Sequence, residues 1–136
     1  GAALAQEYPE KGRTLNIIVP FPAGGASDAL GRIVAQKFGE IWGVNAIVEN
    51  KAGGDMLIGM QATSNAKKDG YTMGLTTLGF VLNGVVLPKQ PVDLSKDFTH
   101  IGMVGRSPHA LAVNANSPYK TFKDLEAATK ASPEKI

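Results

Sequence analysis

The chain has 136 residues, about the size of one average domain, and 43% of them are hydrophobic, which is enough for a core. It has no cysteine, which excludes disulfide scaffolds, thiol catalysis and cysteine-based zinc sites. The formal net charge of +2 comes without a basic cluster, which argues against nucleic acid as a partner, and no apolar stretch approaches the roughly 20 residues of a membrane-spanning helix.

The N-terminal residues carry a pattern that is typical of exported proteins. Ala3-Leu4-Ala5, followed by Gln6, has the small residues on either side of a central position that signal peptidase selects. We interpret these residues as the remnant of a signal peptide, which predicts a periplasmic location. An unrelated N-terminal tail is the alternative.

The next segment predicts a strand, a glycine-rich break and a helix. Residues 15–19 (LNIIV) predict a buried strand, and apolar residues at three- and four-residue spacing from Leu30 onward predict an amphipathic helix that ends at Gly43. Within this helix we expect Ser27 or Asp28 as the N-cap and Phe38 and Trp42 in the core.

Two further strand–helix pairs follow. Strands are expected over 46–48 and 71–76, and helices over 56–66 and 79–87. Strands that alternate with helices predict a parallel sheet with right-handed crossovers, so the loop after each strand lies at the carboxyl edge of the sheet. Ligands of open α/β sheets bind at this edge.

The pattern changes after residue 90. A polar connection, PVDLSKDF, precedes two apolar runs over 101–105 and 110–114, which predict adjacent strands or one long bent strand. Thr121 and Asp124 have the spacing of a capping box and begin a helix that extends to about residue 131, before Ser132-Pro133.

The glycine-rich breaks have the parts of an anion site. A helix N-terminus presents unpaired N–H groups and partial positive charge, and glycine allows a ligand to approach the backbone. The first break, VPFPAGGASD, lacks the Gly-Lys-Ser/Thr ending of a phosphate-binding P-loop and also lacks Gly-x-Gly-x-x-Gly. A carboxylate therefore suits it better than a phosphate, and a plain tight turn is the alternative.

Enzyme chemistry has little support in this sequence. Ser27 does not lie in a Gly-x-Ser-x-Gly elbow, and the two histidines, His100 and His109, lack metal-ligand spacing to any other ligand. We expect no enzyme activity, cofactor or bound metal. A small-molecule enzyme on a flavodoxin-like sheet that uses Ser27, Asp28 or His109 is the alternative, and a dimerising interaction module without a ligand is a third hypothesis.

Several motifs resemble one family when they are taken in order. They are YPEKG, IIVPFPAGGASD, VENKAGG, KKDGYTMGL, PVDLSKDF and the segment from SPHALAVN to the last residue. Together they resemble the N-terminal half of the periplasmic substrate-binding receptors of tripartite tricarboxylate transporters, the Bug receptors. The resemblance covers essentially the whole chain from Tyr8.

The resemblance implies an α/β fold of the type II periplasmic-binding-protein kind, with a mostly parallel sheet flanked by helices. It implies a receptor that captures a small organic acid, such as a carboxylate or dicarboxylate, for the membrane subunits of an uptake system. The ligand-binding residues that it implies are Phe21, Ala23, Gly24, Gly25, Ala26, Ser27, Asp28, Gly53, Gly54, Thr76 and Thr77. In the second loop, Asp55 and Met56 stand where the family usually has further glycines.

The family also predicts the domain organisation. Its receptors are about twice as long, so we expect residues 7–104 to form a first ligand-binding domain and residues 105–136 to begin a truncated second domain. Apolar strands that lack neighbours are prone to pair with another chain. We therefore expect self-association, as a homodimer that exchanges the segment after Asp93.

Overall fold

The computed structural model describes residues 7–86, 90–108 and 110–133. Residues 3–5, which the sequence predicts to be the remnant of a signal peptide, lie outside the described residues. The chain divides into two compact units, Gly1–Gly105 and Arg106–Ile136, and each is described by itself. The predicted division into domains 7–104 and 105–136 stays a prediction. In chain order the elements are β1 (Thr14–Val19), α1 (Ala26–Trp42), β2 (Asn45–Asn50), α2 (Leu57–Ser64), β3 (Thr72–Gly74), α3 (Leu78–Val86) and α4 (Phe122–Ala131).

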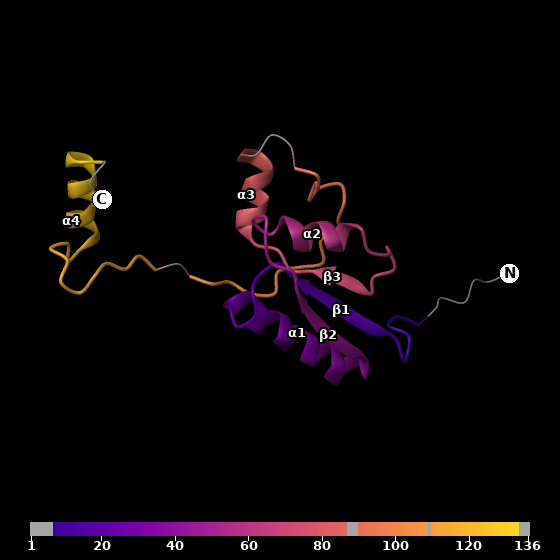
Figure 1. Cartoon of the computed structure of the whole chain (residues 1–136). Coiled ribbons are helices and arrows are strands. Elements are labelled where there is room, and N and C mark those ends of the chain that lie inside the picture. The colour runs from indigo at the N-terminus through magenta and orange to yellow at the C-terminus, as the bar shows by residue number, and fades with distance from the viewer. Residues whose placement is uncertain (1–6, 87–89, 109, 134–136) are drawn as a thin grey trace. The chain divides into compact units, whose positions relative to one another are not determined.

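The first unit is built on a three-stranded parallel sheet in the order β2-β1-β3, which confirms the parallel arrangement (Figure 1). β1 lies in the centre, and its Ile17 is in register with Val48 of β2 and with Met73 of β3. β2 extends beyond the predicted residues 46–48 at both ends, and β3 is shorter than the predicted 71–76. Beyond the end of β3, the Leu75 amide still donates to the Ile18 carbonyl (2.9 Å).

Helices α1 and α2 cover opposite faces of this sheet (Figure 1). The crossover through α1 runs from β1 to β2, and that through α2 runs back past β1 to β3. Because both crossovers are right-handed, opposite directions along the sheet place the two helices on opposite faces. Leu15, Ile17 and Val19 alternate along β1 and are buried, and Ala35 of α1 packs against Ile17 and Val19.

Helix α1 begins and packs differently from the prediction. Its N-cap is Gly25, which makes no side-chain cap bond, so the expected cap at Ser27 or Asp28 is wrong, because both residues lie inside the first turn. Its end at Gly43, in the left-handed conformation (φ +64°), is confirmed. Because Asp28 is not the N-cap residue, its side chain bonds to other groups.

The apolar stripe of α1 is narrower than the sequence indicates. Gly31 and Ala35 are buried and Phe38 is half-buried, so α1 approaches the sheet with small residues toward its first half. Trp42 is 41% exposed and stacks on Phe38, with 4.6 Å between ring centroids; its prediction as a core residue is wrong. Ile33 and Ile41 are also exposed, because a close helix–sheet contact leaves the flanking positions outside.

Helices α2 and α3 lie within a residue or two of their predicted bounds, apart from Leu87, which lies outside the described residues. Within residues 101–108 and 110–114 the structure contains no strand, so the strands predicted there are wrong. A strand needs a neighbour for its backbone groups, and no described residue pairs with these runs. No helix among the described residues is long and apolar enough to cross a membrane.

The second unit contains helix α4, and its predicted capping box is confirmed. The Thr121 hydroxyl accepts from the Asp124 amide (3.3 Å), and an Asp124 carboxylate oxygen accepts from the Thr121 amide (2.8 Å). The helix ends at Ala131, before Ser132, as the sequence predicts. These reciprocal bonds satisfy two N-terminal backbone donors and define where the helix starts.

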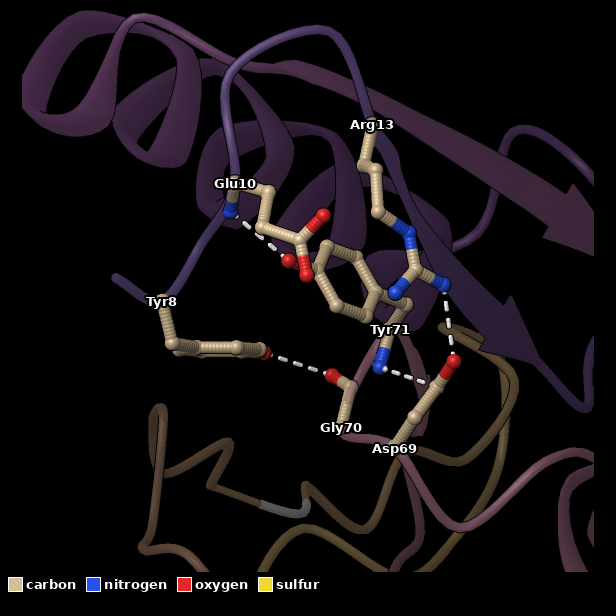
Figure 2. Close-up of polar contacts among 6 residues, drawn as sticks. All are labelled: Tyr8, Glu10, Arg13, Asp69, Gly70 and Tyr71. Carbon is tan, nitrogen blue, oxygen red and sulfur yellow. Dashed lines mark hydrogen bonds and ion pairs between the residues drawn. The ribbon is translucent and has the colours of Figure 1, made fainter. Parts of the chain in front are cut away.

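The amino edge of the sheet is closed by six residues from two segments that are far apart in the sequence. Figure 2 shows them: Tyr8, Glu10, Arg13, Asp69, Gly70 and Tyr71. The Tyr8 hydroxyl donates to the Gly70 carbonyl (2.6 Å), and the Glu10 amide donates to the Tyr71 hydroxyl (2.7 Å). Arg13 pairs with Asp69 (2.7 Å) and lies over the Tyr71 ring, 3.4 Å from its centroid. The YPEKG and KDGY motifs are therefore in contact, and they brace the edge opposite the loops that follow the strands.

Candidate functional site

The loops that follow the three strands lie at one edge of the sheet, as the sequence predicts. They comprise residues 20–25, 51–56 and 75–77. Backbone bonds continue the sheet into them: the Lys51 amide donates to the Val19 carbonyl, and the Leu75 amide donates to the Ile18 carbonyl, both at 2.9 Å. The chain reverses its direction across the sheet between β1 and β3, and this reversal is the position where open α/β sheets bind ligands.

The first loop exposes backbone amides at the N-terminus of α1. Ala23, Gly24, Gly25 and Ala26 are exposed, and Ser27 is half-buried. The Gly24 amide donates to a carboxylate oxygen of Asp28 (2.9 Å), so this amide is satisfied inside the protein. The amides of Gly25, Ala26 and Ser27 donate to no group of the described residues, since the first N–H groups of a helix lack an acceptor in the helix itself.

Asp28 lies beneath this loop and is buried, with 4% of its surface exposed. Its Oδ2 accepts from Arg32 (3.1 Å) as well as from the Gly24 amide, and its Oδ1 accepts from the Asn50 side chain (3.0 Å). The Arg32 guanidinium, followed by the Gly24 and Asn50 donors, lowers the pKa of the Asp28 carboxyl to about 2. Asp28 is therefore an ionised brace that ties the first loop to α1 and to the end of β2.

Sequence reasoning missed the partners of Asp28. Arg32 stands four residues after it, a spacing at which opposite charges meet on a helix, so this pair could have been found. Asn50 had no such signal beyond its place at the carboxyl end of β2. Its amide also donates to the Phe21 carbonyl (3.1 Å), and the Phe21 side chain packs against the core clusters on both sides of the sheet. Contact of Phe21 and Asp28 with a ligand stays a prediction.

The second loop has an uncommon backbone. Gly53, Gly54, Asp55 and Met56 all have positive φ angles, and the Leu57 amide closes the turn on the Gly54 carbonyl (3.0 Å). Gly53 and Gly54 are exposed, whereas Met56 is buried. Asp55 accepts a hydrogen bond from Asn83 of α3.

The third loop lies against the second. Thr76 and Thr77 are both exposed, and the Thr77 hydroxyl donates to the Met56 sulfur (3.4 Å). The structure therefore links two of the three loops that the sequence placed at this edge. A shallow hollow on α4, lined by Phe122, Leu125 and Thr129 among others, includes none of the predicted site residues.

The groups on which enzyme chemistry depends are not assembled among the described residues. The Ser27 hydroxyl has no partner there, and the His100 ring nitrogen lies 3.1 Å from the Leu94 carbonyl. His109 lies outside the described residues. No group of three histidine, aspartate or glutamate side chains within the described part of the chain is placed to hold a metal.

A comparison with protein families identifies the family of this chain. Residues 30–136 match the model of the tripartite tricarboxylate transporter family receptor, known as TctC. The chain belongs to this family. It is a family of receptors and not of enzymes, which confirms both the resemblance and the expectation that the chain is no enzyme.

Individual relatives agree with this assignment. BugT of Bordetella pertussis is 31% identical over 134 residues, which are 97% of this chain and 40% of BugT. A protein of Agrobacterium vitis from the ttuE-ttuC' intergenic region is 33% identical over 129 residues, or 94% of this chain and 37% of that protein. The chain thus spans about two fifths of the length of these curated relatives.

Solved structures confirm the fold class. One, described as a periplasmic transporter, is 34% identical and superposes with a TM-score of 0.57 over 64% of this chain and 29% of its own. An R. palustris protein solved with adipate has a TM-score of 0.78 over 96% of this chain and 43% of its own. At 24% identity the second likeness shows the fold alone.

Proposed function

We propose that this TctC-family chain is part of a periplasmic solute-binding receptor that captures a small organic acid for uptake. The observation that carries the proposal is the group of three backbone amides, from Gly25, Ala26 and Ser27, at the N-terminus of α1. They belong to the loop after the central strand, where the chain reverses direction across the sheet. A carboxylate oxygen there accepts from the amides and meets the positive end of the helix.

The charges of the loop favour a carboxylate over a phosphate. No lysine or arginine lies in the first loop, so nothing in it offsets the second charge of a phosphate. The buried Asp28 carboxylate is negative, but Arg32 pairs with it at 3.1 Å and balances that charge. The adipate in the R. palustris structure of the same fold is a dicarboxylate, which makes dicarboxylates the first class to test.

The remaining site residues complete the proposed ligand surface. Gly53, Gly54, Thr76 and Thr77 are exposed on the two neighbouring loops and are proposed to contact the rest of the acid. The membrane subunits of a tripartite transporter are the proposed downstream partners. We also propose that this chain forms a homodimer, because apolar residues after residue 100 are exposed and can pack against a second copy.

Gly25→Val tests the amide site. A Cβ at Gly25 meets only the Pro22 carbonyl, at 3.8 Å, and φ is −85°, so valine fits the backbone while its side chain covers the amides. We expect adipate, succinate or citrate to raise the melting temperature of the wild-type chain and not that of Gly25→Val. At 100 times its Kd a ligand stabilises by about 2.7 kcal/mol, a readily measured shift.

The control is Gly84→Ala, which adds a methyl group where no atom lies within 4 Å, in a helix outside the first loop. It keeps the ligand-induced shift. Equal shifts in the wild type and in Gly25→Val contradict the amide site, and a shift with inorganic phosphate but not with the acids contradicts the ligand class.

A further inference from the structure

The second loop holds a backbone that its side chains disfavour. The φ angles are +121° at Gly53, +56° at Gly54, +51° at Asp55 and +73° at Met56. Glycine adopts such angles freely, but aspartate does so less readily and methionine rarely. Two non-glycine residues in succession keep this conformation only if their surroundings hold it.

Two contacts from the β3–α3 segment hold these two residues. Asn83 is the only polar residue of α3, and its side-chain amide donates to the Asp55 carboxylate. The Thr77 hydroxyl donates to the Met56 sulfur (3.4 Å), and Met56 is buried in the cluster that contains Phe80 of α3. The contacts from α3 thus fall on the residues whose backbone most needs support.

We propose that Asp55 and Asn83 form a latch that holds the second loop in its ligand-binding conformation. The latch fixes the positions of Gly53 and Gly54, which are the proposed ligand contacts of this loop. This step rests on the proposed function. Asp55 is then a positioning residue. Its carboxylate bonds to Asn83 and does not contact the ligand. Glycine would adopt this backbone conformation without support, whereas Asp55 has the side-chain bond to Asn83.

Amide hydrogen exchange, measured by NMR on the full chain, tests the latch without any ligand. The Leu57 and Ile58 amides donate to the Gly54 and Gly53 carbonyls (3.0 and 3.4 Å) and report on the loop, whereas the Lys51 amide bonds to β1 and serves as the internal control. Asn83→Ala removes the donor and suits a helix. We expect Leu57 and Ile58 to exchange about five-fold faster in this variant, the effect of one lost hydrogen bond, with Lys51 unchanged.

Asp55→Asn is the matched variant, because asparagine keeps an acceptor oxygen for Asn83 and tolerates positive φ. We expect its exchange rates to stay close to those of the wild type. Unchanged exchange at Leu57 and Ile58 in Asn83→Ala overturns the latch, and so does acceleration that includes Lys51 to the same extent, since that reports general loosening.

Calorimetric titration with adipate links the latch to binding. The latch predicts an affinity about five-fold lower in Asn83→Ala and close to wild type in Asp55→Asn. A direct ligand contact by Asp55 predicts the reverse, and that result overturns the positioning role. If the wild type binds no acid while Asn83→Ala still accelerates exchange, the latch stands as a loop-holding device and the proposed function fails.

Discussion

Gly59 is the contact point of α2 with two loops of the proposed site. A Cβ built there lies 2.7 Å from the Pro20 Cβ and 2.9 Å from both the Pro20 Cα and the Lys51 carbonyl oxygen. Pro20 begins the first loop, and Lys51 begins the second. The atoms in the way belong to backbone and to a proline ring, which cannot rotate aside as the end of a long side chain can.

The size of the Gly59→Ala effect follows from two opposing terms. Overpacking of a core contact costs about 1 to 3 kcal/mol, and the rigidity of these neighbours places Gly59 near the upper value. Alanine regains up to about 1 kcal/mol of helix propensity over glycine. The net loss is about 2 kcal/mol, which for a unit of this size lowers the melting temperature by about 10 °C.

The assay is urea unfolding followed by far-UV circular dichroism, together with a thermal melt. Gly84→Ala is the matched control, because it is also a helical glycine but has nothing within 4 Å of the added methyl group. It is expected to be neutral or more stable by up to about 1 kcal/mol. If Gly59→Ala is as stable as Gly84→Ala, α2 does not rest on the loop backbones as described, and the reasoning is refuted.

Three further predictions concern other parts of the chain. The pKa of the Asp28 carboxyl falls from 3.8 to about 2 on folding, so its ionisation stabilises the folded state fully above about pH 4 and loses this effect toward pH 2. The free energies of unfolding of wild type and Asp28→Asn, measured by denaturant titration, should therefore differ at pH 5 and converge near pH 2. Tyr71→Phe keeps the ring under Arg13 but removes the acceptor of the Glu10 amide, and urea unfolding should show a loss of about 1 kcal/mol, whereas no loss means that water replaces the bond. The exposed apolar side chains of residues 101–113, such as Ile101 at 82%, should drive self-association at micromolar concentration; a monomer by size-exclusion chromatography with light scattering contradicts this.

Periodicity and turn residues were sufficient to predict the order of strands and helices over residues 14–86. The three parallel strands, their helices and the shared edge of the loops follow from apolar runs punctuated by glycine, because each of these signals is local. The same method failed over residues 101–108 and 110–114. An apolar run favours a strand only if another strand pairs with it, and a local pattern contains no information about the partner.

The sequence predicted that the three loops share one edge of the sheet, but it did not predict the bonds within them. Glycines at a strand–helix junction indicated the loop, yet the sequence favoured Ser27 or Asp28 as the N-cap, which is wrong. The structure uses Asp28 as a brace, because Asn50 and the Gly24 amide reach it from another strand and from the preceding turn. The Asn50 contact depends on the strand order, which the spacing of residues does not reveal.

Side chains support the backbone at both edges of the sheet, but they bond to different backbone groups at each edge. At the amino edge, Tyr8 and Tyr71 use their hydroxyls to satisfy backbone groups of the opposite segment. At the carboxyl edge, the Asp28 carboxylate accepts from the Gly24 amide, Arg32 and Asn50, and no buried side-chain nitrogen or oxygen among the described residues lacks a partner. Side chains thus stabilise the first loop from beneath, and the amides of Gly25 to Ser27 stay available. A fixed loop loses little entropy when an acid binds, so the same brace that costs the chain a buried charge prepares the amides for a ligand.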